Sequence, residues 1–416
     1  MSSILSFFSR HYNIYTNGRQ PPKSESPIRF GILGAAKIGP RALILPALQH
    51  PEAVVTAIAA RSPTKASLYA KKHNIPHVLA TYDDLVVSDQ IDAVYIPLPN
   101  GLHLEWAVKA LRAGKHVLLE KPSVSNAREA EHLFNNKEMI GDRVLLEAFH
   151  YRFQPCWLLF KSLVDLERVE RVRGCLFVPE GVMKEDDIRF RYDLAGGALM
   201  DLGYTISVVR GILETEPIQC TSCKVTPRAA PEEKVDMGYD ATFEFPGGVT
   251  AEVHGGFQAG VWESLMGDKR PTAEAVHRPV VVEDPSLPEG QEKVRTRTVT
   301  MINFIVGNLW HRIDVVDEWM VRKKDTGEVV GRWTEKEVKK GYTWEEAGIK
   351  GLEDRHSEEY WLSYKFQLDE FIDRIKGRKG TGVWVSSEES INQMKAVDMA
   401  YEKSGLGVRE GTGFRL

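Results

Sequence analysis

Five short apolar runs in the first third of the chain alternate with segments that have the pattern of helices. The runs are continuously apolar, which is typical of strands buried on both faces of a sheet. They cover residues 29–33, 53–60, 91–96, 116–120 and 143–147, and the helical segments cover 41–49, 64–73, 104–113 and 126–134. Strands that alternate with helices predict an α/β unit over residues 28–147, with a doubly wound parallel sheet.

The pattern changes after Tyr151. A helical segment at 155–165 precedes runs in which apolar and polar residues alternate, at 172–178, 241–245, 249–253 and 294–300. Alternation with a period of two indicates antiparallel strands with one buried face. Further helices are expected at 197–213, 357–376 and 387–404, and a long loop or insertion at 267–293. Residues 148–416 are therefore predicted to form a second α/β domain.

Composition argues against several classes of partner. The formal net charge is −4 and the pI is about 6.3, so no surface for nucleic acid or acidic lipid is indicated. No run approaches 18 consecutive apolar residues, which argues against a membrane-spanning helix. The apolar part of the N-terminus is too short and too interrupted for a secretory signal, and residues 1–27 are interpreted as a flexible extension.

The chain has four cysteines, which for its length is no disulfide framework. Cys220 and Cys223 form a CxxC, a spacing found in redox pairs and in zinc half-sites. No second CxxC or histidine pair stands at the spacing that would complete a metal site, and we predict none. This cysteine usage favours a reducing compartment, the cytoplasm.

A glycine turn follows the first predicted strand. Gly34-Ala35-Ala36-Lys37-Ile38-Gly39 is nearly G-x-G-x-x-G, the pattern that binds dinucleotides. Gly34 supplies the tight turn, Ala36 stands where a second glycine lets the backbone approach a pyrophosphate, and Gly39 allows close packing of helix and strand. The phosphates would lie at the N-terminus of the next helix, next to Lys37 and Ile38, where free amides favour anions.

The end of the second predicted strand indicates which dinucleotide binds. An NAD site usually has a carboxylate there, which accepts from the ribose 2′-hydroxyl. This chain has Arg61 and Ser62 instead. An arginine pairs with a 2′-phosphate, and a serine can donate to it, so the sequence favours NADP(H) over NAD(H).

Several further motifs accompany the glycine turn. They are Pro97-Leu98-Pro99-Asn100 with His103, Ala113-Gly114-Lys115-His116-Val117, Glu120-Lys121-Pro122, the segment 147–153 and the segment 196–203. Together they resemble the glucose–fructose oxidoreductase/inositol dehydrogenase/rhizopine-catabolism (Gfo/Idh/MocA) family. Within it, the chain is most similar to the branch of dimeric dihydrodiol dehydrogenases and fungal NADP-dependent D-xylose dehydrogenases.

The resemblance implies a Rossmann domain followed by an α/β domain with a large, mostly antiparallel open sheet, which often forms a homodimer interface in the family. It implies an oxidoreductase for a small carbohydrate or cyclic diol, such as a D-xylose 1-dehydrogenase or a trans-dihydrodiol dehydrogenase. Lys121 would orient and activate the substrate hydroxyl and touch the cofactor. Further cofactor contacts are expected from Glu120 and from Leu98, Asn100 and His103.

The chain departs from the family pattern at a second catalytic position. The family has an aspartate followed four residues later by a catalytic tyrosine or histidine, whereas here Tyr204 follows Asp201 by three and Thr205 stands fourth. The main interpretation is that the helix begins one residue late and Tyr204 still reaches the crevice, and residues three apart also share a helix face. Alternatively, His150 or Tyr151 takes the proton, or catalysis has been lost.

Substrate contacts are expected from Asp201 and from Tyr151, Arg152 and Asp187, although a salt bridge or surface pair is an alternative for Arg152 and Asp187. The main function predicted is NADP-dependent hydride transfer. A cofactor-sensing regulator of the same fold without turnover is the alternative, and redox-neutral chemistry on a sugar with tightly held NAD is a third.

Overall fold

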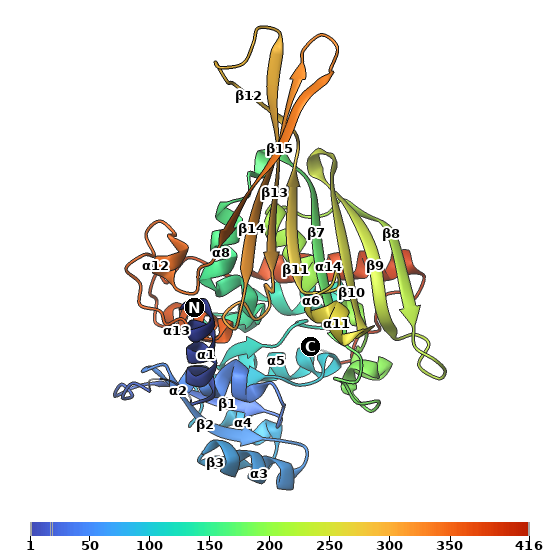
Figure 1. Ribbon diagram of the computed structural model, residues 1–416. Helices are drawn as coiled ribbons and strands as arrows, with labels where there is room; N and C mark the ends of the chain where they lie inside the picture. The colour runs from blue at the N-terminus through green and yellow to red at the C-terminus, as the bar shows by residue number, and fades with distance from the viewer. Residues whose placement is uncertain (1, 17, 19, 415–416) are drawn as a thin grey trace.

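The computed structural model describes residues 2–16, 18 and 20–414 and contains two sheets, one in each part of the chain (Figure 1). The first sheet has six parallel strands in the order β3-β2-β1-β4-β5-β6. Its strands are β1 Ile28–Leu33, β2 Ala53–Ala59, β3 His77–Leu79, β4 Ala93–Ile96, β5 His116–Leu119 and β6 Leu145–Glu147. The predicted doubly wound sheet is confirmed, and the order of its strands reverses between β1 and β4, where ligands bind in such sheets.

Short helices connect these strands. They are the π-helix Pro40–Ile44, α2 Leu45–Leu48, α3 Pro63–His73, α4 Tyr82–Val87, α5 His103–Arg112, α6 Ala127–Phe134 and α7 Lys137–Ile140. All four residues of β4 are buried, which explains the continuous apolar run. The sequence did not indicate β3, because this edge strand is short and largely exposed and has no apolar pattern.

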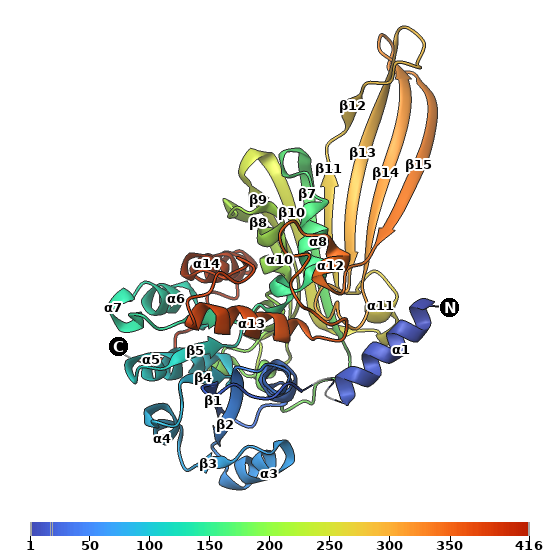
Figure 2. The same cartoon turned by 90° about the vertical axis from the view of Figure 1, so that its left-hand side faces the viewer.

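The second sheet has nine strands and is antiparallel except where β7 pairs with β10. Its main order is β15-β14-β13-β11-β7-β10-β9-β8, and β12 pairs with β13. The strands are β7 Val169–Pro179, β8 Gln219–Pro227, β9 Asp236–Phe245, β10 Val249–Ala259, β11 Thr272–His277, β12 Val280–Val282, β13 Gln291–Ile302, β14 Arg312–Lys323 and β15 Val329–Lys339. Strands β12 to β15 extend beyond the rest of the sheet as an arm (Figure 2).

The helices of the second part are α8 Pro155–Ser162, α9 Ala198–Asp201, α10 Tyr204–Leu213, α11 Val261–Leu265, α12 Trp344–Ala347, α13 Ser363–Ile375 and α14 Ser387–Ser404. Helices α8, α10 and α14 cover one face of the nine-stranded sheet (Figure 2). Helix α14 has the predicted bounds: Ser386 and Glu389 form a capping box, and Gly405 ends it in a left-handed conformation.

Three predicted segments need correction. Residues 267–293 are not one long loop, because they contain β12 and also β11, which lies between β7 and β13. The helix expected at 357–376 begins only at Ser363, and the helix expected at 197–213 is interrupted after Asp201. Strand β11 pairs along both edges, with β7 and β13, which its polar sequence context did not indicate.

The N-terminal extension contains a helix, and its predicted flexibility stays a prediction. Residues Ser2–Tyr15 form helix α1, although positions 1, 17 and 19 lie outside the described residues. Arg10 is buried, pairs with Glu359 at 3.1 Å and lies over the ring of Tyr342. The pattern of apolar residues in the sequence does not indicate these contacts of Arg10.

A segment near the C-terminus contacts both parts of the chain. Arg409 donates to Asp236 at 2.7 Å, and both side chains of this pair are almost completely buried. The carbonyl of Arg409 accepts from Asn126, and Glu129 accepts from the amide of Thr412. Because Asn126 and Glu129 belong to the start of α6, this segment fixes the parallel sheet relative to the second sheet.

Candidate active site

Lys121 follows β5 at the carboxyl edge of the parallel sheet and points toward the second part of the chain. Its Nζ donates to the main-chain oxygen of Asp201 at 2.7 Å and to Asp201 Oδ1 at 3.0 Å. The side chains of Lys121 and Asp201 are only 11% and 14% exposed. Since Asp201 ends helix α9, the ammonium also caps the last carbonyl group of that helix.

Asp201 also forms an ion pair with a second cationic side chain, that of Arg189. Arg189 Nε donates to Asp201 Oδ2 at 2.7 Å, and Arg189 Nη1 donates to Asp187 Oδ1 at 3.0 Å. Burial raises the pKa of Asp201, but the charges of Lys121 and Arg189 outweigh burial and bring the pKa to about 2. Asp201 is therefore a fixed carboxylate near neutral pH rather than a proton acceptor.

Tyr204 lies against Lys121 despite its shifted position in the sequence. Helix α9 ends at Asp201 and helix α10 begins at Tyr204, so the two residues do not share one continuous helix. Lys121 Nζ lies 4.8 Å from the centre of the Tyr204 ring. Burial raises the pKa of Tyr204 well above its ordinary value. The neighbouring Thr205 is fully buried and bonds Tyr239 at 2.7 Å.

The two alternative proton acceptors have other contacts. The Nδ1 atom of His150 lies 2.7 Å from the hydroxyl of Ser363, and its ring lies 3.9 Å from that of Tyr364. Burial, with a smaller contribution from Lys121, lowers the pKa of His150 to about 3. Tyr151 is completely buried and its hydroxyl lies 2.9 Å from that of Ser207. The structure thus places Tyr151 in the core.

The remaining predicted substrate residues separate into two groups. Asp187 joins the Lys121–Asp201 pair through Arg189. Arg152 instead pairs with Glu389 at 2.6 Å, at the first turn of α14. The structure therefore brings Asp187 close to Lys121 and gives Arg152 a salt bridge.

The glycine turn has the shape that a dinucleotide site needs. Gly34 has a φ of 96°, and a Cβ atom there would lie 3.1 Å from Leu98, so a side chain would be strained and would crowd the turn. The carbonyl of Ala36 accepts from the Tyr69 hydroxyl at 3.1 Å. Lys37 is exposed, and Ala36 and Ile38 are half-buried. The hydrogen bond from Tyr69 thus fixes the turn, while Lys37 and, in part, Ala36 and Ile38 remain accessible to a ligand.

Arg61 and Ser62 follow β2 at the same edge of the sheet. The side chain of Arg61 is exposed. Ser62 caps α3, because its hydroxyl oxygen accepts from the amide of Lys65 at 3.4 Å. This contact leaves the hydroxyl proton of Ser62 able to donate to a ligand.

Glu120 and His103 support the loops around Lys121. Glu120 is buried and accepts from the Tyr95 hydroxyl at 2.7 Å, and burial raises its pKa. Both ring nitrogens of His103 lie 2.8 Å from carbonyl oxygens, those of Pro122 and Leu98. His103 therefore joins the loop after β4 to the loop after β5. Asn100 Nδ2 donates to the carbonyl of Ala195, on the other part of the chain.

Two residues near Lys121 were missed by sequence reasoning. Arg189 stands two residues after the predicted Asp187, so the local sequence offered a signal. Tyr364, on α13, is close enough to Glu120 and Asp201 for their charges to raise its pKa, in addition to the larger effect of burial. Nothing in the sequence around residue 364 indicates this position, because the long-range fold creates it.

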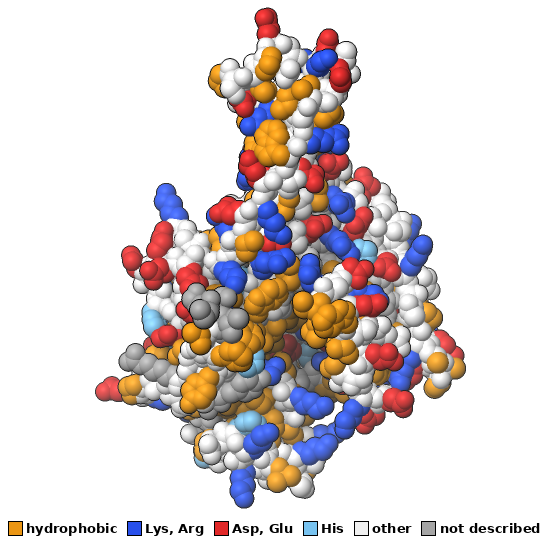
Figure 3. Space-filling model, in the orientation of Figure 1, with side chains coloured by type: hydrophobic (Ala, Val, Ile, Leu, Met, Phe, Trp, Pro, Cys, Tyr) orange, Lys and Arg blue, Asp and Glu red, His pale blue; other side chains and the backbone are white. Residues whose placement is uncertain are grey.

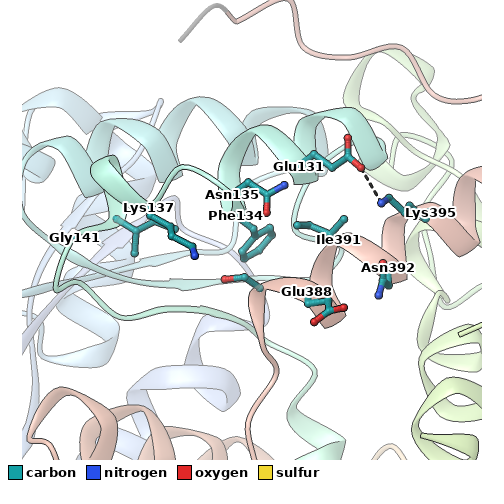
Figure 4. Close-up of a pocket in the computed structure, with 11 residues that line it drawn as sticks. Glu131, Phe134, Asn135, Lys137, Gly141, Glu388, Ile391, Asn392 and Lys395 are labelled. Carbon is teal, nitrogen blue, oxygen red and sulfur yellow. Dashed lines mark ion pairs between the residues drawn. The ribbon is translucent and has the colours of Figure 1, made fainter. Parts of the chain in front are cut away.

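The surface is hollowed near the centre of the face shown in Figure 3, where the second sheet meets the parallel-sheet domain, and apolar side chains surround the hollow. A separate groove of about 660 Å³ lies between α6, α7 and α14 (Figure 4). An ion pair of 2.8 Å between Glu131 and Lys395 crosses this groove. None of the predicted site residues lines it.

Within residues 2–16, 18 and 20–414, no helix has the length and apolarity needed to cross a membrane. The same part of the chain has no cluster of three or more histidine, cysteine, aspartate or glutamate side chains placed to bind a metal ion. Cys220 and Cys223 lie on β8 as free thiols, and burial raises the pKa of each, to about 11 and about 12.

Comparison with known proteins agrees with this architecture. Residues 28–147 match the oxidoreductase family with an NAD-binding Rossmann fold, and residues 165–270 match the GFO/IDH/MocA C-terminal domain. D-xylose 1-dehydrogenase (NADP(+)) 2 of Haloferax volcanii is 40% identical over 233 residues, which are 55% of this chain and 69% of that protein. Trans-1,2-dihydrobenzene-1,2-diol dehydrogenase of Xenopus tropicalis is 30% identical over 47% of this chain and 60% of that protein.

A 3-ketoreductase of Actinomadura kijaniata, solved with NADP and TDP-benzene, has the same fold, with a TM-score of 0.65 and 22% identity over 91% of this chain and 98% of that one. The fold and the site define an NAD(P)-dependent dehydrogenase or reductase that acts on CH–OH groups. This chain belongs to the Gfo/Idh/MocA oxidoreductase family.

The depressed pKa of Asp201 predicts a pH-dependent contribution to stability. Because this pKa is about 2 rather than the ordinary 3.8, the stabilisation is present above pH 3.8 and is lost as the pH falls toward 2. We expect Asp201→Asn to lower the free energy of unfolding by about 2 kcal/mol at pH 7, and the difference from wild type to shrink below pH 4. Denaturant unfolding at several pH values measures this.

Asp193→Asn is the matched control, because Asp193 is mostly exposed and pairs with Arg191. We expect no measurable change for it at any pH. A stability difference for Asp201→Asn that stays constant between pH 7 and pH 2.5 would contradict the assignment of a charged Asp201.

Proposed function

We propose that this chain is an NADP-dependent oxidoreductase that transfers hydride between the nicotinamide and a carbinol carbon of a sugar or cyclic diol. The substrate is of the kind used by a D-xylose 1-dehydrogenase or a trans-dihydrodiol dehydrogenase. The observation that carries the proposal is the placement of the Lys121 ammonium between Asp201 and the Tyr204 ring, at the carboxyl edge of the parallel sheet. The names of the similar proteins from Haloferax and Xenopus support the substrate class.

The cofactor-side residues fit NADP(H). Gly34 has the positive φ and the lack of a side chain that a pyrophosphate turn requires. Arg61 and Ser62 would hold the 2′-phosphate, Arg61 through its exposed guanidinium and Ser62 through its hydroxyl proton. When bound, the nicotinamide supplies the hydride donor or acceptor.

Lys121 and Tyr204 divide the proton chemistry between them. Oxidation of a carbinol requires its hydroxyl proton to leave as negative charge develops on oxygen, and the Lys121 ammonium stabilises that charge. Burial keeps Tyr204 protonated in the free protein, so it can donate to the developing alkoxide during reduction. In the opposite direction the nearby ammonium favours the phenolate that Tyr204 becomes when it accepts the substrate proton.

Asp201 holds Lys121 in place during both directions of reaction. Its low pKa keeps it ionised, so the ammonium retains a counter-charge and a fixed position. His150 is uncharged near neutral pH and packs beside Tyr364, which gives it a positioning role. Tyr151 has no role in proton transfer in this proposal, because its hydroxyl lies in the core.

We further propose that the chain is a cytoplasmic homodimer joined through the nine-stranded sheet. The face of this sheet away from α8, α10 and α14 carries paired charges, such as Arg171–Glu252 and Lys336–Asp314. A dimer joined through this face would have a polar interface, with a composition close to that of the rest of the protein surface. Sedimentation equilibrium should give a mass of about twice the 46.9 kDa of one chain, and a concentration-independent monomer would contradict the proposal.

The cofactor preference is tested by Arg61→Ala. We expect the Kd for NADP to rise by about 10- to 100-fold, because a charge-assisted pair contributes about 1.5–3 kcal/mol. The Kd for NAD should change by less than about twofold, since NAD lacks the 2′-phosphate that Arg61 would bind. Lys71→Ala, which removes an exposed cation from the same helix α3, is the control. An equal loss for both cofactors would contradict the 2′-phosphate assignment.

Lys121→Ala tests the chemistry and separates the enzyme from a regulator. With a panel of pentoses, hexoses and cyclic diols, wild type should change the absorbance of the nicotinamide. The variant should lose at least about 100-fold in kcat, with the NADP Kd altered far less. Lys137→Ala, at an exposed lysine of α7, should retain wild-type turnover. Tight NADP binding by wild type without turnover of any sugar, diol or matching carbonyl would favour the cofactor-sensing regulator.

A further inference from the structure

Arg189 and Lys121 bind different oxygen atoms of the Asp201 carboxylate. Arg189 Nε donates to Oδ2 at 2.7 Å, while Lys121 Nζ donates to Oδ1 at 3.0 Å. With one cation on each oxygen, the carboxylate cannot rotate without breaking a charge-assisted bond. The orientation of Asp201, and so the position of the Lys121 ammonium, depends on Arg189 as well as on Lys121.

A second carboxylate fixes Arg189 itself. Asp187 Oδ1 accepts from Arg189 Nη1 at 3.0 Å and from the Arg189 amide at 3.1 Å. The side chain of Arg189 is held at both its Nε and its Nη1 atoms, by Asp201 and Asp187 respectively. This geometry uses the planar fork of a guanidinium, which a lysine does not provide.

The backbone places Arg189 against the start of α9. The carbonyl of Arg189 accepts from the amide of Gly197 at 2.9 Å. A Cβ atom at Gly196 would lie 2.4 Å from that same carbonyl oxygen, so the segment can approach this closely only because residue 196 is a glycine. Arg189 is therefore docked on the same short helix that ends in Asp201.

The charges around Asp201 come from several elements. Lys121 and Glu120 follow β5, and Arg189 and Asp187 lie in the segment before α9. Three further titratable side chains face this group: Tyr204 from α10, His150 from the segment after β6, and Tyr364 from α13. Near neutral pH, Lys121 and Arg189 face two carboxylates, Asp201 and Asp187, and Glu120 is a third, more deeply buried carboxyl. Removing Arg189 would leave a local excess of negative charge.

We propose that Arg189 is a positioning residue of the active site, which fixes Asp201 and through it the catalytic Lys121. This inference rests on the proposed function, and it adds a residue to that site. An excess of negative charge makes loss of a proton from neighbouring groups less favourable. The rising limb of the pH–rate profile for oxidation should therefore move to higher pH when Arg189 is replaced by a neutral residue.

The test compares Arg189→Met, Arg189→Lys and the control Arg191→Gln over a range of pH. Arg191 lies two residues away, is exposed and pairs with Asp193. For Arg189→Met we expect kcat to fall by about 10- to 100-fold with KM within about threefold, and the rising limb to move up by about one pH unit. Arg189→Lys keeps the positive charge, so the rising limb of its pH–rate profile should lie at the wild-type pH. It should recover only part of kcat, because lysine lacks the planar fork of the guanidinium. Arg191→Gln should match wild type.

The proposal is overturned if Arg189→Met keeps kcat within about twofold of wild type. It is also overturned if the rising limb of the pH–rate profile of this variant stays at the wild-type pH. An activity-independent readout separates this from the failure of the proposed function. Arg189 lowers the pKa of Asp201, so the stability lost in Arg189→Met should shrink below pH 4. It should shrink much less in an Asp201→Asn background, where only Asp187 still pairs with Arg189. If wild type turns over no substrate, the proposed function fails and this stability comparison decides the role of Arg189. A loss that depends on pH equally strongly with and without Asp201 overturns the proposal.

Discussion

The ion pair between Lys121 and Asp201 connects the two parts of the chain at the point where chemistry is expected. Lys121 belongs to the loop after β5 of the parallel sheet, and Asp201 belongs to a short helix that packs on the second sheet. Both side chains are largely buried, and a buried charge that loses its partner is strongly destabilising. The two domains must therefore be held in one relative position for this pair to exist.

Several polar contacts provide that position. Asp236 accepts from the amide of Leu199 at the start of α9, while Arg409 satisfies its other oxygen. The carbonyl of Arg409 is in turn held by Asn126 of the parallel-sheet domain. One chain of hydrogen bonds thus runs from α6 to the helix that carries Asp201. His103 fixes the other side, because it joins the loops that follow β4 and β5.

Aromatic packing around Lys121 sets the environment in which its charge acts. Tyr204 contacts the rings of Phe149, His150 and Tyr151 edge to face, and Tyr364 covers His150. These rings reduce the access of water, so the ammonium and the carboxylate interact more strongly than they would at the surface. The same burial keeps the Tyr204 phenol protonated and His150 neutral. An ion pair surrounded by aromatic rings, such as Lys121–Asp201, is well placed to stabilise negative charge that develops on a substrate oxygen.

The sequence by itself predicted the doubly wound parallel sheet, the glycine turn at Gly34 and the location of Lys121 at the end of a strand. These features are local: buried parallel strands are continuously apolar, and a turn with positive φ requires glycine. Periodicity also located helix α14 with its capping residues. The roles of the site residues stay predictions, but the meeting of Lys121, Asp201 and Tyr204 is a property of the fold.

Only the tertiary structure decided the rest. The sequence left open whether Tyr204 reaches Lys121, because Tyr204 stands three residues after Asp201 rather than four. The structure has a break between α9 and α10, and Tyr204 lies against Lys121. It also could not indicate that the Tyr151 hydroxyl is buried against Ser207, or that Tyr364, 243 residues after Lys121 in the sequence, lies near Glu120 and Asp201. Side chains distant in sequence meet only when two sheets pack together, and no local pattern records that packing. The sequence determined the elements and the chemistry they carry, and long-range packing determined which of those side chains face one another.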